Sequence, residues 1–148
     1  MNENALAELL AFLSGAPALA GVALRAEDAG PAPDTGGLWP RGVRVLQRRE
    51  DVAGGVTLRC RAEFLLRLCL PLPPGDGVQA ARNAGRLLAL QAWVAAESAA
   101  CRAPVFGAGL PQSESLRAED GRLERADTGG TARYSLTLRA EYEWTPQP

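Results

Sequence analysis

One glycine motif and two pairs of carboxylates are the parts of this sequence whose types and spacing could do chemistry. Gly75, Gly77 and Ala80 fit the Gly-x-Gly-x-x-Ala pattern of a dinucleotide-binding turn. The fingerprint also needs an acidic residue about 20 positions further on, after a second parallel strand. Glu97 has that distance but falls inside the helix that follows the turn. We therefore expect a proline-glycine turn leading into a capped helix, with no nucleotide bound.

The carboxylate pairs suggest a cation site only weakly. Glu119 and Asp120 are adjacent, and Glu141 and Glu143 share one face of a predicted strand. Either pair could bind a divalent cation, because hard cations prefer oxygen ligands. Two arginines of the same strand share the face of the second pair, so a solvated or subunit-contacting charge ladder is expected there. A metal-dependent enzyme is the least favoured class, because three or more clustered acidic ligands are not visible.

The side chains that most enzymes use are missing. The chain has no His and no Lys, and all 16 basic residues are arginine. Imidazole bases, Schiff bases and P-loop lysines are therefore excluded. Cys60, Cys69 and Cys101 are an odd, widely spaced set without the four ligands of a structural zinc site. We expect reduced thiols, no catalytic residues, no metal and no cofactor: a protein that is not an enzyme.

The composition limits the cellular compartment and the binding partners that this protein can have. The 148 residues fit a single domain, and 47% of them are hydrophobic, enough for a packed core. The net charge of −1 gives no electrostatic footprint for nucleic acid. No apolar run reaches the ~18 residues of a membrane span, and the first residues do not resemble a signal peptide. We expect a soluble intracellular protein.

The hydrophobic pattern also predicts the elements of the first half. A Leu-rich helix is expected over residues 3–14, capped by Asn2 and ended by Gly15 and Pro17. Further along, the pattern predicts a strand at 22–25, an irregular loop from Glu27 to Pro40, a strand at 42–49, a Gly54-Gly55 turn within 51–55, and a strand from Val56 to Leu70. The last of these alternates strictly between apolar and polar residues, as an antiparallel strand with one wet face does.

The second half begins with a helix from Asp76 to about residue 100. Its bulky side, with Leu87, Leu88, Leu90 and Val94, should pack on the sheet, and Trp93 should project on its polar side. A side of small residues could admit another backbone closely. A hairpin at 113–119 and 122–126 with an Asp120-Gly121 turn, and a closing strand at 131–144, complete the order α-β-β-β-α-β-β-β. The predicted fold is a single α+β domain over residues 1–148, with a largely antiparallel sheet and both helices on one face.

Several of these features together resemble the minor capsid or tail-terminator proteins of tailed phages and prophages, which join head to tail. The shared features are the Leu-rich N-terminal helix, the Pro/Gly segment, the Gly-Gly turn and a helix with an Ala92-Trp93-Val94 stretch. The most specific element is the closing strand, GTARYSLTLRAEY, from Gly130 to Tyr142. The resemblance spans nearly the whole chain and contains no catalytic motif.

The resemblance implies a structural protein of the virion tail, assembled in the bacterial host cytoplasm. Such a protein forms a ring, commonly a hexamer, that caps the tail tube and faces the head connector. Its partners would be copies of itself, the tail tube protein and the head-completion protein, with no nucleic acid and no membrane. The run Arg48, Arg49, Glu50 and Asp51 has mixed charges that suit a subunit or tube contact, together with parts of the 27–40 loop. The alternative is a small, non-enzymatic ligand- or peptide-binding module that uses a pocket between helix and sheet.

Overall fold

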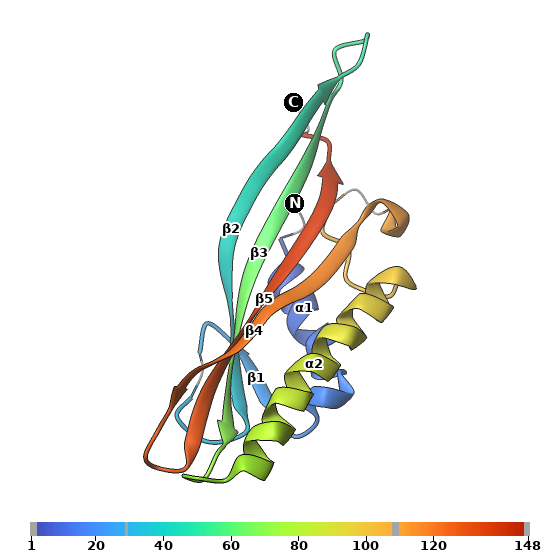
Figure 1. Ribbon diagram of the computed structural model, residues 1–148. Helices are drawn as coiled ribbons and strands as arrows, with labels where there is room; N and C mark the ends of the chain where they lie inside the picture. The colour runs from blue at the N-terminus through green and yellow to red at the C-terminus, as the bar shows by residue number, and fades with distance from the viewer. Residues whose placement is uncertain (1–2, 29, 108–109, 147–148) are drawn as a thin grey trace.

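The computed structural model describes residues 3–28, 30–107 and 110–146, which form one α+β domain with a five-stranded mixed sheet (Figure 1). Two short 3-10 turns, Pro17–Leu19 and Pro111–Ser113, join its elements. The helices and strands are α1 (Ala5–Ser14), β1 (Ala23–Ala26), β2 (Thr35–Glu50), β3 (Val56–Pro71), α2 (Gly77–Ala99), β4 (Ser115–Ala126) and β5 (Thr131–Trp144).

The sheet has the strand order β1-β2-β3-β5-β4, in which only the short β1–β2 pair is parallel. β3 and β5 are its centre and are antiparallel, with Phe64 opposite Leu138 and Leu66 opposite Leu136. The even-numbered side chains of both strands are largely buried, and Leu66 and Leu136 are fully so. Because apolar and polar residues alternate strictly in both strands, only one register puts all the apolar side chains on the same, buried face of the sheet. The prediction that the even-numbered residues of these strands are buried is therefore confirmed.

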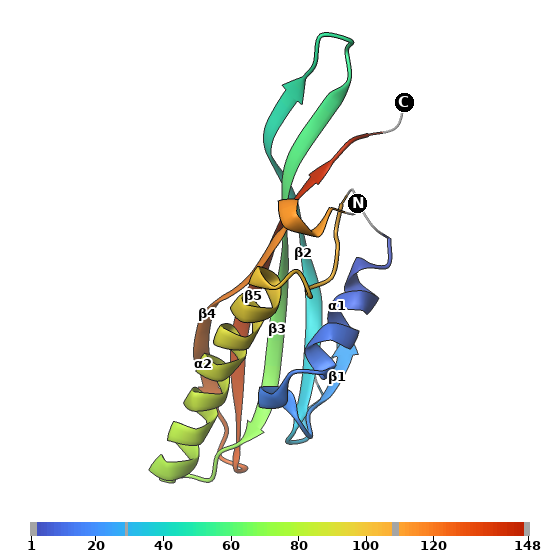
Figure 2. The same cartoon turned by 90° about the vertical axis from the view of Figure 1, so that its right-hand side faces the viewer.

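Both helices pack on that apolar face, as expected (Figure 2). α1 buries Leu9 and Leu13, and α2 buries Leu87, Leu90 and Val94. The predicted cap of α2 is confirmed, because the Asp76 carboxylate accepts a hydrogen bond from the backbone N–H of Gln79 at 3.0 Å. The predicted cap of α1, Asn2, lies outside the described residues.

Two side chains of α2 differ from the sequence prediction. Trp93 does not project from the polar side but stacks on Phe12 of α1, with ring centroids 4.6 Å apart. Leu88 does not pack on the sheet and is 67% exposed. The reason is that α2 packs against both the sheet and α1. The buried side of the helix therefore faces α1 as well as the sheet, and Leu88 lies outside it.

Two strand predictions are also corrected. β2 begins at Thr35, so the second half of the expected loop is a strand, and Gly36, Gly37 and Leu38 are buried in it. The expected hairpin at Asp120-Gly121 is a bulge within one continuous strand, β4, whose register with β5 shifts between Glu119 and Arg122. The structure therefore has two strands after α2 rather than three. Asp120 adopts a positive φ of 56°, which a bulge uses as readily as a turn.

An irregular segment, residues 103–107, completes the core above the upper part of the sheet. Phe106 is buried, and its ring centroid lies 5.9 Å from that of Phe64 and 6.2 Å from that of Tyr142. The Glu114 carboxylate fixes the segment by accepting hydrogen bonds from the backbone N–H groups of Phe106 and Gly107. The segment therefore covers the part of the apolar face that the helices leave open.

The buried hydroxyl of Tyr142 is expected to make the free energy of unfolding sensitive to alkaline pH. Burial, with smaller contributions from Cys60 and Glu114, raises the pKa of Tyr142 to about 12, and burial also raises the pKa of Cys60. Because both folded-state values lie above the unfolded ones, the native state keeps protons that the unfolded state loses. We expect the free energy of unfolding to have its maximum value below about pH 9 and to fall by roughly 2–3 kcal/mol as the pH rises toward 12. Denaturant titrations at each pH test this.

The matched variant is Tyr142→Phe, which keeps the ring and removes the ionisable group. Its stability should fall less steeply over the same pH range, leaving the smaller contribution of Cys60. An equally steep fall in the variant would show that Tyr142 is not the group responsible.

Candidate assembly surface

The most prominent feature of the surface is a projecting hairpin, here called the arm, which is residues 43–62. It consists of the outer halves of β2 and β3 with their turn, and it extends beyond both helices (Figures 1 and 2). The C-terminal end of β5 runs beside its base, where Trp144 lies opposite Leu58. Beyond that point the arm is only two strands wide.

The tip of the arm is a tight turn built on Asp51. Its carboxylate accepts hydrogen bonds from the backbone N–H groups of Ala53 at 2.9 Å and Gly55 at 2.8 Å. Gly54 has a φ of +85°, a conformation that favours glycine. The predicted Gly-Gly turn is confirmed. The arm therefore ends in a defined turn, on which Val52 is fully exposed.

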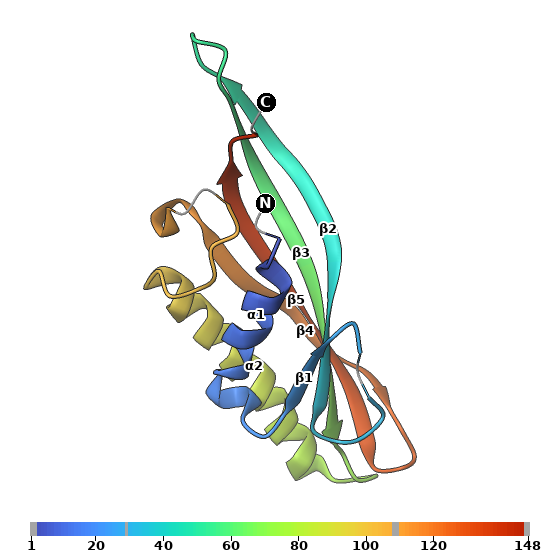
Figure 3. The ribbon, with the colours of Figure 1, turned by 180° about the vertical axis from the view of Figure 1, so that it is seen from behind.

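The outer edge of β2 is free along most of its length (Figure 3). Among the described residues, β1 pairs with β2 only over Thr35–Leu38. Beyond Leu38, β2 has a strand on one side only, so backbone groups on its other side have no strand to pair with. This edge also exposes aliphatic side chains: Val43 is 49% exposed, Val45 54% and Leu46 39%. A long edge with exposed aliphatic residues is a template for pairing with another strand.

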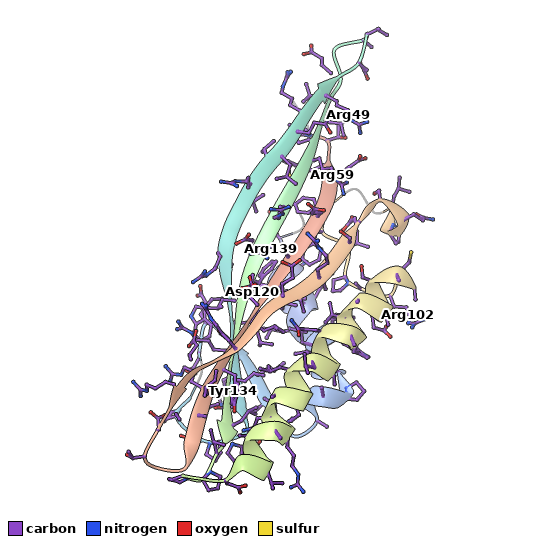
Figure 4. All side chains as sticks on the ribbon, viewed as in Figure 1. Arg49, Arg59, Arg102, Asp120, Tyr134 and Arg139 are labelled. Carbon is purple, nitrogen blue, oxygen red and sulfur yellow. The ribbon has the colours of Figure 1, made fainter. Side chains whose placement is uncertain are left out.

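The sheet face opposite the helices is polar and carries a ladder of ion pairs between strands. Arg49 of β2 pairs with Glu143 of β5 at 3.0 Å. Further down, Arg61 pairs with Glu141 at 3.0 Å. The expected charge ladder is therefore present, although its arginine partners come from the neighbouring strands. Figure 4 shows Arg49, Arg59 and Arg139 in order along this part of the sheet.

The ladder continues to the bulge of β4. There the guanidinium of Arg139 pairs with Glu63 at 3.0 Å, with Asp120 at 3.6 Å and with Glu119. The hydrogen bond to Glu63, with a smaller contribution from the one to Glu119, raises the pKa of Arg139, although partial burial opposes this shift. Glu119 and Asp120 thus neutralise an arginine. Within the described residues, no three Cys, Asp or Glu side chains are grouped closely enough to hold a metal ion.

The four residues predicted as a contact site all lie at the end of the arm and are exposed. Arg48 pairs with Glu50 at 3.1 Å, and Arg49 pairs across strands with Glu143. Asp51 holds the turn, as described above. The structure therefore places Arg48, Arg49, Glu50 and Asp51 together. It does not place the rest of the predicted contact, the 27–40 segment, beside them, because that segment starts from the opposite end of β2 (Figure 3).

A second apolar surface lies at the other end of the molecule, between α2 and β4. A groove of about 400 Å³ runs there, and its walls include Leu87, Leu88, Leu123 and Tyr134. Leu123 is half exposed and Leu88 more so. The sequence suggested a pocket between helix and sheet only as an alternative and without residues, because its pattern assigned Leu88 to the side of the helix that packs on the sheet. The small residues beside Leu88 are exposed, and close approach of another backbone to them stays a prediction.

The glycine motif has the surroundings of a turn. Gly75 has a φ of +76°, and Asp76 caps the helix that begins at Gly77. The strands before and after α2, β3 and β4, run in the same direction but are not neighbours, because β5 lies between them and is antiparallel to both. They therefore do not form the adjacent parallel pair of a dinucleotide-binding unit. None of the described helices is both long and apolar enough to cross a membrane.

Comparisons with known proteins leave the family open. No protein-family model matches the sequence, and no curated protein matches it. One solved structure aligns with 100% of this chain and 98% of its own, with a TM-score of 0.49 and 12% sequence identity. A likeness at that score carries no argument about fold or function.

Proposed function

We propose that this chain is a structural, non-enzymatic protein of a phage or prophage tail: a terminator that closes the tail tube with a ring and joins it to the head. The observation that carries the proposal is the arm with its free, partly aliphatic β2 edge. A surface of this kind suits assembly with another chain. The resemblance of the closing strand, Gly130 to Tyr142, to tail-terminator proteins supports the same conclusion.

The topology of the sheet favours a ring over a two-fold dimer. β4, at the opposite edge, runs antiparallel to β2, because each neighbouring pair from β2 through β3 and β5 to β4 is antiparallel. Two copies in the same orientation can therefore pair β2 of one with β4 of the next in the antiparallel manner. Such a contact joins two different patches of the subunit, and repeated contacts of that kind close into rings.

Charge disfavours the alternative in which β2 pairs with β2 of a second copy. The edge carries Arg41, Arg44, Arg48 and Arg49 but only one acidic residue, Glu50. An antiparallel pair of identical edges would bring these arginines near one another, and like charges opposite each other destabilise a sheet. β4 has acidic and basic residues in equal number between Arg117 and Arg125, counting Glu119, Asp120 and Glu124 against Arg117, Arg122 and Arg125. The edge of β4 is therefore the better partner.

The proposed partners are copies of this chain, commonly six, with the tail tube protein below the ring and the head-completion protein above it. The protein would assemble in the host cytoplasm and remain in the virion tail. Each exposed ion pair at such contacts contributes only ~0–1 kcal/mol. Repetition around a tube can still hold the ring by multivalency, while the free subunit remains monomeric.

Charge reversal at the end of the arm tests this function in the parent phage or prophage. In Arg48→Glu with Arg49→Glu, two exposed pairs are lost, so the unfolding free energy should change by no more than about 1–2 kcal/mol. Electron microscopy should nevertheless show overlong tubes, defective tube ends or unjoined heads. The matched control is Arg82→Glu, an exposed arginine on α2 far from the arm. Normal particles in normal yield from the double variant would show that Arg48 and Arg49 are not part of a subunit or tube contact.

The groove between α2 and β4 supports a second candidate, a small ligand- or peptide-binding module. Its volume and apolar walls suit a short apolar side chain or ligand. Under this alternative, Leu88→Asp would abolish binding of a hydrophobic dye such as ANS while tail assembly in the parent phage stayed normal. Loss of tail assembly in Leu88→Asp would contradict this alternative.

A further inference from the structure

A polar hollow of about 330 Å³ lies where β2 bulges, on the charged face of the sheet. Its lining residues are Arg41, Gly42, Val43, Arg44, Arg61 and Glu63. The bulge inserts one residue between Pro40 and Gly42, and Gly42 has a φ of +119° with no atom within 4 Å of the position of a Cβ. The missing side chain of Gly42 therefore leaves the hollow open, with three guanidinium groups around it.

Two of the three guanidinium groups around the hollow have no carboxylate partner among the residues that the structure describes. Arg41 and Arg44 are exposed, and neither side chain has an ion pair or hydrogen bond with the described residues. Arg44 lies directly opposite Arg61 on the next strand. One terminal nitrogen of Arg61 donates a hydrogen bond to Glu141, while the Nε of Arg61 is buried without a hydrogen-bond partner. The single carboxylate of the hollow, Glu63, is already bonded by Arg139 at 3.0 Å.

The opposition of Arg44 and Arg61 is electrostatically unfavourable when no anion is bound. Like charges directly opposite on neighbouring strands destabilise a sheet. Other arginines of the arm avoid the problem, since Arg48 and Arg49 each have a carboxylate within 3.1 Å. An oxyanion between Arg41, Arg44 and Arg61 would relieve the repulsion, and guanidinium groups match the two oxygens of a carboxylate.

We propose that the hollow around Arg41, Arg44 and Arg61 binds a carboxylate presented by an acidic segment of another protein chain. A nucleic acid fits less well, because Glu119, Glu124, Glu141 and Glu143 line the same face and would repel a continuous polyanion. A single acidic side chain, or two in sequence, brings less negative charge against those carboxylates than a continuous polyanion does. The inference depends only on the hollow and does not require that the chain be a tail protein.

The experiment is an NMR titration of the ¹⁵N-labelled protein, observed at the arginine Nε–H groups. The probe is the peptide acetyl-Gly-Glu-Glu-Gly-amide, with the Gln-Gln peptide, inorganic phosphate and a thymidine decanucleotide as comparators. We expect saturable shifts with the acidic peptide at millimolar concentration and none with the Gln-Gln peptide. Arg44→Gln should weaken binding about tenfold, as expected for the loss of a charge-assisted hydrogen bond. The matched control is Arg133→Gln, which removes an arginine from the same face outside the hollow and should leave binding unchanged.

Thermal unfolding adds a readout that a purely structural arginine would not give. In chloride buffer, Arg44→Gln should raise the unfolding temperature slightly, because it removes the repulsion from Arg61. The acidic peptide should stabilise the wild type and not the variant. Absence of saturable shifts with any anion, or equal binding by Arg44→Gln, overturns the site. Tighter binding of the decanucleotide than of the acidic peptide overturns the choice of a protein carboxylate.

Discussion

Replacing Val43 and Val45 together by aspartate is expected to leave a folded monomer that no longer assembles. Both side chains lie on the free edge of β2 and are about half exposed, so the fold loses little when they become polar. At an assembled contact they would be buried, and each would contribute roughly 1 kcal/mol of apolar burial that aspartate replaces with a desolvation cost. We expect each subunit contact to weaken by about 100-fold or more, and a ring of several such contacts to disappear.

Sedimentation of the purified variants, alone and with isolated tail tubes, measures this loss. The matched control is Gln47→Asp, which adds the same charge on the opposite face of the arm, across from Arg59. The control should stay folded and assemble nearly as well as the wild type. Equal assembly by the Val43→Asp, Val45→Asp protein would show that the β2 edge is not the contact.

Truncating Phe106 to alanine is expected to cost the fold about 3–5 kcal/mol, the range for a buried phenylalanine. Phe106 is buried against Phe64 and Tyr142. The remaining cavity could be filled only by movement of the segment that Glu114 holds in place. Because small domains are stable by about 5–15 kcal/mol, a large share of the total would be lost.

Urea unfolding compares this variant with two others. Phe106→Leu keeps most of the volume and should cost less than half as much. Phe12→Ala removes a ring that is only partly buried against Trp93, so its cost should also be smaller. Equal stability of wild type and Phe106→Ala would mean that residues 103–107 do not belong to the core.

The parts of the fold that sequence could predict are those in which local pattern and long-range packing agree. β3 and β5 alternate strictly, so both their type and their buried face were predicted correctly. The capping Asp76 marked the start of α2 correctly, but the buried side of α2 was predicted wrongly at Leu88 and Trp93. The start of β2 was not, because Gly36, Gly37 and Pro40 disfavour a strand locally. There, pairing with β3 on one side and β1 on the other overrides the weak local preference.

The candidate assembly surface was predicted only in part, for a similar reason. The charged run from Arg48 to Asp51 signals a turn, and the structure places it at the tip of the arm. The freedom of the β2 edge could not be predicted, because it depends on how far β1 extends beside β2. The polar hollow could not be predicted either, since a bulge and the opposition of Arg44 and Arg61 are properties of strand register. In both cases the missing information is which strand lies beside which.

The proposed ring can be seen by electron cryomicroscopy of the purified protein mixed with isolated tail tubes of the parent phage. We expect a closed ring at one end of each tube, with all subunits in the same orientation and the β2 edge of each against β4 of the next. Tubes whose ends remain bare at saturating protein, or two-fold dimers joined through any other surface, would contradict it.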